Sequence, residues 1–522
     1  MPDGNPTDWT RSRAPTTPMD RPAPSSATRR QQRFFYVPVP VKYAFALSLA
    51  IAWIGFSIWA SGPWLHDLAD WAGWPFAIIS TTFIAYIPGF MNAFMLGTLL
   101  TDRRPPRRQP PSYPPVSILV AAYNEAGSIH ETLRSLSLQS YPGEMEILVL
   151  DDGSTDETSA ITARSIRELG WARGHSARLL AASENAGKAS VLNWGLAQAR
   201  HDLIVTVDGD CWVTVDGLKN LVERYLSDPR GTEAVAGTVL AKNSRNTWLT
   251  RAQEWDYFHG IAAVKRMQSM YHGTLVAQGA FSLYRRAALE RVGGWPDCVG
   301  EDIVVSWGML KQGARIGYAE DALVFTNVPE RFGHFASQRK RWSRGLIEAF
   351  QAHGSLLAHH RMTTLFIWWN LLFLPIDLAY SLIFIPGLIL ALLGSFHLAG
   401  PMTLLVLPLA AAWNMIIFAI QRRMFNGQGF RVRRNLGGFF FYALAYSLLM
   451  HPVCVWGYVN ELLGLRKTWG RRAGSHGSQP APSLVEIDAW APQPEHPAPQ
   501  HVFVGQAGSD EVRLDLEIPA VR

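Results

Sequence analysis

Charge-free apolar runs at both ends of the chain limit its fold more than any other feature. Tyr43 to Ala60 and Trp71 to Leu100 contain no charged residue. Each is long enough to cross a hydrocarbon layer of about 30 Å, which takes about 20 helical residues. A second apolar block runs from Met362 to Gln421 with one acid, Asp377, and the run Asn435 to Asn460 follows it. We therefore expect one folded domain between two sets of membrane helices.

The charges beside these runs predict their orientation. Asp67 and Asp70 lie between the first two runs, whereas four arginines follow the second run within residues 103–108. By the positive-inside rule, the N-terminus and the region after residue 101 are cytoplasmic. The number of later crossings stays open, because three would place the basic segment 466–472 outside and four would place it inside; the rule favours four. This layout predicts a multi-pass protein of the inner (plasma) membrane.

The composition excludes several other classes of protein. The three cysteines, Cys211, Cys298 and Cys454, form no CxxC pair, so neither a disulfide framework nor a zinc site is expected. The net charge is +6, but the arginine-rich segments flank apolar runs and no basic face is interleaved with aromatic residues. Nucleic acid is therefore not an expected partner, whereas a lipid bilayer is.

Between the apolar blocks, short β-branched runs alternate with helical ones. We expect strands at 116–122, 146–150, 203–207, 234–240 and 322–326, and helices at 129–138 and 189–198. The alternation predicts a mainly parallel α/β sheet with ligands beyond the carboxyl ends of its strands. The expected parts are a disordered basic tail (1–40), two membrane helices (41–100), a cytoplasmic domain with an interfacial helix (101–358), a membrane bundle (359–465) and a mostly disordered tail (466–522).

Two carboxylates, Asp208 and Asp210, follow the expected strand 203–207 with Gly209 between them. A turn here brings both near one point, and hard cations such as Mg²⁺ or Mn²⁺ bind such oxygens together with substrate phosphates. The alternative is that these residues simply form a polar turn that ends the strand. The pair therefore indicates a metal site only in combination with other motifs.

Polar residues also follow the two strands before it. Because parallel strands end at one edge, Glu125 and Asp152 could accept hydrogen bonds from a nucleobase and a ribose, or they could cap the helices that follow. Lys188 begins the helical run after 187 and could place a positive charge beside a phosphate, although an isolated lysine is usually just exposed.

Two further motifs lie downstream. Glu301 and Asp302 begin a helical run, where they are either favourable first-turn charges or a catalytic base. Gln338, Arg341 and Trp342 lie in a basic segment. An arginine fork matches phosphate oxygens and an indole face stacks on a sugar ring, but a basic amphipathic helix on the bilayer is the alternative.

In order, these motifs resemble those of the processive family-2 glycosyltransferases, which include cellulose, chitin, hyaluronan and poly-N-acetylglucosamine synthases. The resemblance covers about residues 115 to 345. It rests on Tyr123-Asn124-Glu125, Asp151-Asp152-Gly153-Ser154, Gly187-Lys188, Asp208-Gly209-Asp210, Gly279-Ala280-Phe281-Ser282, Glu301-Asp302 and Gln338-x-x-Arg341-Trp342. Val264-Lys265-Arg266 and Val328-Pro329-Glu330 are most similar to the poly-β-1,6-N-acetylglucosamine synthase branch.

The resemblance implies a GT-A fold, a UDP-sugar donor with N-acetylglucosamine favoured, inversion at the anomeric carbon, and export of a growing β-linked polysaccharide. A small accessory membrane subunit is a further partner that it allows. It assigns Tyr123, Glu125 and Asp152 to the uridine, and Asp208 and Asp210 to the ribose, the diphosphate and the metal. Asp302, beside Glu301, is the general base that it implies. Gln338, Arg341 and Trp342 form the diphosphate and acceptor clamp, and Gly279 to Ser282 form the acceptor floor.

Two departures and three alternatives accompany this interpretation. Gln278 stands where many members have Ser or Cys, and Gly300 where many have Thr, so acceptor and linkage stay open. The chain could instead transfer one sugar to a lipid, or use another UDP-sugar as cellulose and hyaluronan synthases do. A non-catalytic export subunit is the third alternative, but intact carboxylates at 151, 152, 208, 210 and 302 argue against it.

Overall fold

The structure is a computed structural model that describes residues 36–103, 107, 109–271, 273–427, 434–465 and 485–488. The described residues from Val37 onward belong to one compact unit. Most of the two predicted tails, 1–40 and 466–522, lies outside the described residues, and so does most of the basic segment 103–108.

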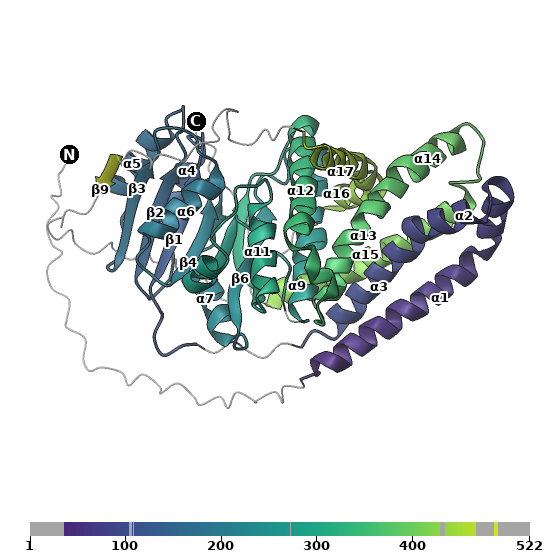
Figure 1. Ribbon diagram of the computed structural model, residues 1–522, viewed down its shortest axis with the longest axis horizontal. Coiled ribbons are helices and arrows are strands. Elements are labelled where there is room, and N and C mark those ends of the chain that lie inside the picture. The colour runs from purple at the N-terminus through teal and green to yellow at the C-terminus, as the bar shows by residue number, and fades with distance from the viewer. Residues whose placement is uncertain are drawn as a thin grey trace, which may run out of the picture. The chain divides into compact units, whose positions relative to one another are not determined.

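One sheet organises the middle of the chain (Figure 1), with the strand order β5-β8-β6-β7-β4-β1-β2-β3-β9. Strands β3, β2, β1 and β4 are parallel to one another, and β6 is parallel to β8. Strand β7 joins the two groups by antiparallel pairing with both β4 and β6. The predicted, mainly parallel α/β sheet is confirmed. The strands are β1 Val116–Ala122, β2 Met145–Asp151, β3 His175–Ala181, β4 Leu203–Asp208, β5 Trp212–Val213, β6 Thr232–Ala241, β7 Phe281–Arg285, β8 Arg315–Thr326 and β9 Val485–Asp488.

Helices cover both faces of this sheet. In β1 the side chains alternate: Ile118 and Val120 belong to the core on one face, whereas Leu119 belongs to the core on the other. The core around Leu119 continues through Tyr271 to Phe94 of the apolar helices. The domain helices are α4 Ile129–Ser137, α5 Thr158–Glu168, α6 Lys188–Gln198, α7 Gly217–Ser227, α8 Trp248–Trp255, η2 Asp256–Ala263, α9 Val264–Ser269, α10 Arg286–Arg291, α11 Glu301–Lys311, α12 Phe332–His353 and η3 Gly354–Ala358.

The start of α11 packs closely on α12 through two glycines. A Cβ on Gly300 would lie 2.5 Å from the Cα of Gly345, and a Cβ on Gly345 would lie 2.7 Å from the Cα of Gly300. The Gly300 amide also donates to Glu348 Oε2 at 2.8 Å. A threonine at 300 would not fit at this distance, so the departure from the family pattern has a steric cause and fixes Glu301 and Asp302 against α12.

Long apolar helices flank the domain in sequence. Among the described residues, four helical segments are long and apolar enough to cross a membrane: Val39–Ala72, Trp74–Leu100, Thr364–Leu392 and Leu436–Leu462. Helix α15 is a further 27-residue helix between the last two. The individual elements are α1 Val39–Ala72, α2 Trp74–Thr81, η1 Thr82–Tyr86, α3 Ile87–Leu100, α13 Thr364–Ala379, η4 Tyr380–Phe384, α14 Ile385–Leu392, α15 Pro401–Gly427, α16 Leu436–Phe441, η5 Tyr442–Tyr446 and α17 Ser447–Leu462.

The segment α13–α14 leads away from the domain and α15 returns to it. Before α13, Arg361 donates to the backbone carbonyls of Leu310, Gly313 and Ala314 in the domain. After α14, the indole of Trp71 stacks on His397, with ring centroids 5.4 Å apart, at the connection between α1 and α2. Near the end of α15, Gln421 Oε1 accepts from Arg266 of α9 at 3.2 Å.

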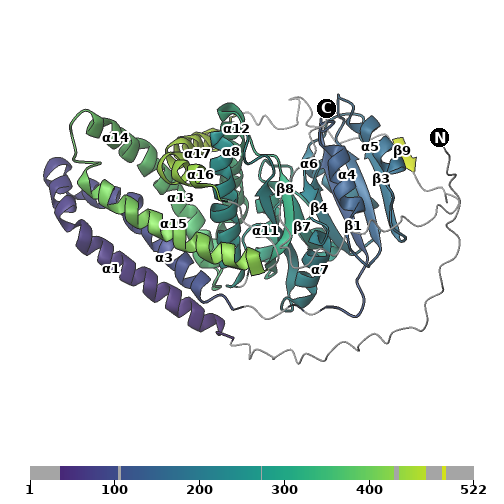
Figure 2. The same cartoon turned by 180° about the vertical axis from the view of Figure 1, so that it is seen from behind.

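The segment α16–α17 begins and ends at the domain. At its start, Asn435 accepts a hydrogen bond at its backbone carbonyl from the Trp255 indole at 2.9 Å. At its end, Arg344 of α12 donates to Glu461 Oε2 and to the Leu465 carbonyl, both at 2.7 Å. Helices α16 and α17 are seen nearly end-on, whereas α1, α3, α13 and α15 run lengthwise (Figure 1, Figure 2). This segment therefore runs across the other apolar helices.

The described residues of the region expected to form a membrane bundle thus contain three long helical segments, where the charge pattern favoured four crossings. Two of them, α13–α14 and α15, begin within residues 362–421. Within the C-terminal tail, β9 pairs antiparallel with β3, placing Val485 opposite Ala181. These four residues are a local exception to the expected lack of structure.

Candidate functional site

The carboxyl ends of β1, β2 and β4 meet at one edge of the sheet, as expected. The amide of Asp152 donates to the Ala122 carbonyl and the amide of Gly209 donates to the Ala121 carbonyl, both at 2.9 Å. Among the described residues, Asn124 is the one non-glycine residue with a positive φ, 57°. Its side-chain oxygen accepts from the Thr155 amide at 2.9 Å, so the loops after β1 and β2 are tied together.

Glu125 faces the Asp208 and Asp210 carboxylates from the loop after β1. Ser128 donates to Glu125 Oε2 at 2.5 Å, and the Glu125 amide donates to Thr158 Oγ1 at 2.8 Å. Burial, together with the charges of Asp210 and Asp208, raises the pKa of Glu125 to about 7. Tyr123, two residues earlier, is exposed beside it. Glu125 can therefore accept or donate a hydrogen bond near neutral pH.

The two aspartates after β2 differ in their contacts. Asp151 Oδ1 accepts from the Ser154 amide at 3.0 Å and shapes the loop that leads to α5. Asp152 accepts from the Ala186 amide at 2.7 Å and from the Gly187 amide at 2.9 Å. Burial raises the pKa of Asp152 to about 6. Asp152 therefore holds the turn that positions Lys188, the first residue of α6.

Lys188 joins motifs that lie far apart in the sequence. Its Nζ lies 2.6 Å from Asp208 Oδ1 and 3.6 Å from Glu301 Oε1. Burial alone would lower the pKa of Lys188, but the charges of Asp208 and Glu301 raise it. Burial raises the pKa of Glu301 to about 7. The end of β4 and the start of α11 therefore meet at one ammonium group.

The loop before β7 passes directly over this contact. A Cβ on Gly279 would lie 2.8 Å from Lys188 Nζ and 3.8 Å from Glu301 Oε1, so a side chain there would displace the lysine. Ser282 is buried, and its hydroxyl donates to the Gln278 carbonyl at 2.7 Å. Gln278 donates in turn to the Gly237 carbonyl at 2.8 Å. Gly279 therefore borders the site, whereas Ser282 and Gln278 fix the shape of the loop.

Asp210 lies against β8 on the other side of Asp208. Its Oδ2 accepts from Thr326 Oγ1, the last residue of β8, at 2.8 Å. Burial, with the charge of Asp208 as a second cause, raises the pKa of Asp210. In the described part of the chain, no three or more His, Cys, Asp or Glu side chains group as they would around a metal ion. A cation here would rest on these two carboxylates and on oxygens from a ligand.

Asp302 lies at the first turn of α11 beside Glu301. Its Oδ1 accepts from the Ile303 amide at 2.8 Å, and both acids lie in the first turn of the helix, whose N-cap is Gly300. Its carbonyl accepts from Ser306 Oγ at 2.6 Å, and the Ala277 amide donates to the same hydroxyl at 2.9 Å. The Asp302 side chain is only partly buried.

Gln338, Arg341 and Trp342 share one face of α12, as their spacing of three and four residues requires. Burial lowers the pKa of Arg341, an effect that the charges of Glu301, Asp208 and Asp302 oppose. Arg341 therefore lies close to the three carboxylates. The Trp342 side chain is 43% exposed, and its ring centroid lies 6.3 Å from that of Tyr257.

Arg339 was not singled out in the sequence, where it belongs to a basic segment. It is 4% exposed, and its Nη2 lies 2.6 Å from Asp256 Oδ2. Its guanidinium carbon lies 4.2 Å from the Trp342 ring centroid, and aromatic rings of Phe335 and Tyr446 lie within 5.9 Å. One face of the indole is therefore held by a cation. The signal for this pair in the sequence was Asp256, the one acid in the otherwise mostly apolar segment 255–263.

The sequence comparisons agree with this geometry. Residues 117–293 match the model described as glycosyl transferase family 2. The chain carries a family 2 glycosyltransferase domain. Poly-beta-1,6-N-acetyl-D-glucosamine synthases of Staphylococcus epidermidis and Staphylococcus aureus are each 32% identical to it over 231 residues. These matches cover 44% of the chain and 54% of each synthase, so the chain spans about half the length of these relatives. The likeness to this branch, read from the motifs, is confirmed.

A solved structure shows the same fold. The mannosyltransferase PcManGT from Pyrobaculum calidifontis, in complex with GDP-Man and Mn²⁺, aligns with a TM-score of 0.52 and 21% identity. The alignment covers 74% of this chain and 99% of that one. The glycosyltransferase domain therefore has the GT-A fold that the resemblance implied.

We predict that Arg339 and Asp256 stabilise the glycosyltransferase domain together, so that losing either residue removes the contribution of both. Arg339→Gln leaves the buried Asp256 carboxylate without its cation, which should cost roughly 3–5 kcal/mol of stability. Asp256→Asn should cost a similar amount, and the double variant no more than either single one. Thermal unfolding of the purified full chain measures this, with the exposed Arg331→Gln as control. Additive losses would contradict the pairing.

Proposed function

We propose that the protein transfers a sugar, most favourably N-acetylglucosamine, from a UDP-sugar to a growing β-linked polysaccharide, with export through its own membrane helices. The observation that carries this proposal is the contact of Lys188 with both Asp208 and Glu301, since it gathers the donor and acceptor motifs at one point. The similarity to poly-beta-1,6-N-acetyl-D-glucosamine synthases supports the choice of sugar.

Each side of the site suits one substrate. Glu125 and Asp152 border the edge where a nucleobase and ribose would bind, and Lys188 and Arg341 supply positive charge for the diphosphate. The free face of Trp342 would stack on the acceptor sugar, whose hydroxyl would approach Asp302.

In the transfer step, the acceptor hydroxyl oxygen bonds to the anomeric carbon from the face opposite the leaving group. The bond between that carbon and the diphosphate oxygen breaks, and UDP leaves with the electron pair. Asp302 takes the proton of the attacking hydroxyl. One displacement inverts the anomeric configuration, which converts an α-linked donor into a β-linked product.

Asp208 and Asp210 would hold Mg²⁺ or Mn²⁺. Their side chains fit such an ion, because both carboxylates follow one strand and Mg²⁺ usually binds one or two carboxylates together with substrate phosphates. When bound, the cation would neutralise charge on the diphosphate leaving group. Together with Lys188, the cation would concentrate positive charge around the diphosphate of the leaving UDP.

UDP release by the purified full chain tests the donor and the cation together. With UDP-N-acetylglucosamine and Mn²⁺, release should be rapid; EDTA should abolish it, and added Mn²⁺ should restore it. Asp210→Asn should lower release at least about 10²-fold while the protein stays folded, since one of two cation ligands loses its charge. Asp202→Asn is the matched control, because Asp202 precedes β4 at its opposite end. Full activity in EDTA would exclude the cation, and no release from any UDP-sugar would exclude the function.

The helices suggest a topology. We propose that α1, α2–α3, α13–α14 and α15 cross the membrane, while α16–α17 lies along its surface, because both ends of α16–α17 contact the domain. These four crossings, two before the catalytic domain and two after it, place both termini on the side of the catalytic domain. This agrees with the basic residues after 465 and with the pairing of β9 on β3.

Single cysteines in a chain freed of its own three cysteines test this topology. A cysteine at position 395, in the connection after α14, should react with a membrane-impermeant reagent in intact cells. One at position 474 should react only after permeabilisation. Labelling of position 474 in intact cells would show an odd number of crossings.

A further inference from the structure

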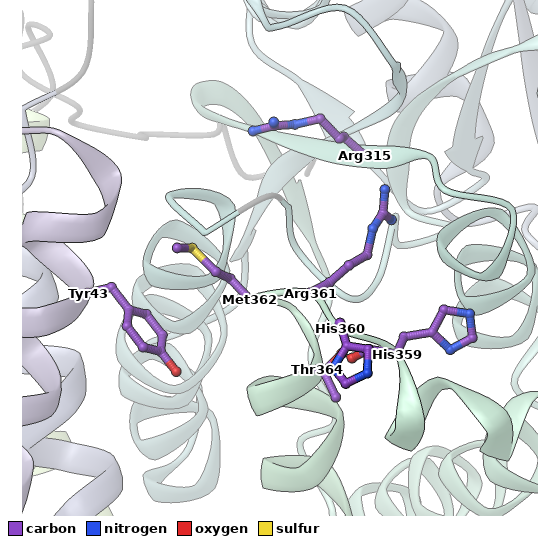
Figure 3. Close-up of a pocket in the computed structure, with 7 residues that line it drawn as sticks. All are labelled: Tyr43, Arg315, His359, His360, Arg361, Met362 and Thr364. Carbon is purple, nitrogen blue, oxygen red and sulfur yellow. The ribbon is translucent and has the colours of Figure 1, made fainter.

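A cavity of about 800 Å³ lies outside the catalytic site, at the junction of the domain with its apolar helices. Figure 3 shows Tyr43 and Met362 on one side of it, and Arg361 and His359 on the other. Its seven lining residues come from α1, from the start of β8 and from the connection into α13; they are Tyr43, Arg315, His359, His360, Arg361, Met362 and Thr364.

The polar lining is cationic or donates hydrogen bonds. Two arginines and two histidines line the cavity, and no carboxylate is among the lining residues in the described part of the chain. The two Nη groups of Arg361 donate to carbonyls at the end of α11, so its charge is fixed in place. His359 Nδ1 lies 2.9 Å from the Ser355 carbonyl and donates to it. Such a lining matches a phosphate oxygen group.

Apolar surface begins immediately beside this cationic lining. Tyr43 lies in the second turn of α1, and Val41 and Phe45 on either side of it are exposed. Thr364 begins α13, on which Trp368 is exposed one turn later. Both helices belong to segments long and apolar enough to cross a membrane. A ligand that fits this arrangement has an anionic head and apolar tails.

We propose that this cavity binds the phosphate head group of an anionic phospholipid. Basic pockets at the cytoplasmic ends of membrane helices suit such head groups, and the exposed residues of α1 and α13 would lie along the acyl chains. The site depends on the proposed membrane location but not on the proposed sugar transfer.

A bound lipid would reach the catalytic elements through Arg361. That residue anchors the end of α11, whose first residues are Glu301 and Asp302. It also follows α12 and η3 directly, and α12 carries Gln338 and Trp342. A head group held by Arg361 and His359 would therefore restrain both helices at their ends remote from the substrates.

Native mass spectrometry of the full chain in detergent tests the site, with phosphatidylglycerol and phosphatidylcholine as probes. We expect retained phosphatidylglycerol and little phosphatidylcholine. Arg315→Gln should weaken retention about fivefold, the contribution of one basic residue near a lipid head group. Met362→Trp keeps every charge but fills the cavity, and it should weaken retention at least as much. Arg230→Gln, at an exposed position of the domain, is the charge-matched control.

Three outcomes would overturn the proposal: equal retention of the two lipids, unchanged retention in the folded Met362→Trp variant, or displacement of the lipid by inorganic phosphate at the same concentration. The last would identify a site for free phosphate. Because no donor is present, a negative result leaves the proposed transferase function intact, and failed UDP release leaves the lipid site intact.

Discussion

The contact of Lys188 with Asp208 and Glu301 is the interaction on which the rest of the site depends. Asp208 ends β4 and Glu301 starts α11, so without a cation between them two partly buried carboxylates would repel each other. Lys188 supplies that cation from the first turn of α6. Its position is set in turn by Asp152, which accepts hydrogen bonds from the amides just before it.

A second constraint is the close packing of α11 on α12. Because Gly300 and Gly345 bring two backbones into contact, the acids at the start of α11 and the Gln338, Arg341 and Trp342 face of α12 keep a fixed relation. Arg339 completes this arrangement by holding one face of Trp342. The geometry of the candidate site thus depends on the packing of α11 against α12 as well as on the carboxyl ends of the strands.

The sequence predicted the parts of the fold that have a strong local signal. Strands β1, β2 and β4 are largely apolar runs, and a carboxylate ends each strand or follows it within three residues. Both the strands and the gathering of their ends could therefore be foreseen. Strand β3, His175–Ala181, was missed because it is only half-buried, carries Arg178 and has no β-branched residue. Strand β7, Phe281–Arg285, was missed because its first two residues were assigned to the acceptor floor.

Other features depend on contacts that a sequence does not display. The role of Arg339 requires Asp256 and Tyr446, which lie 83 and 107 positions away in the chain. The course of α16–α17 depends on Arg344 and Trp255 at its two ends, whereas its composition alone resembles a membrane span. The steric need for Gly300 could not be known before Gly345 was seen opposite it.

The most direct test of this account is the turnover of Asp302→Asn, measured at saturating UDP-sugar alongside UDP affinity. Asparagine keeps the shape of the side chain but cannot take the proton of the acceptor hydroxyl. The account predicts a loss of turnover of roughly 10²-fold or more, with UDP affinity little changed. Turnover equal to that of the unaltered protein would show that Asp302 is only a first-turn carboxylate of α11, and that the base lies elsewhere.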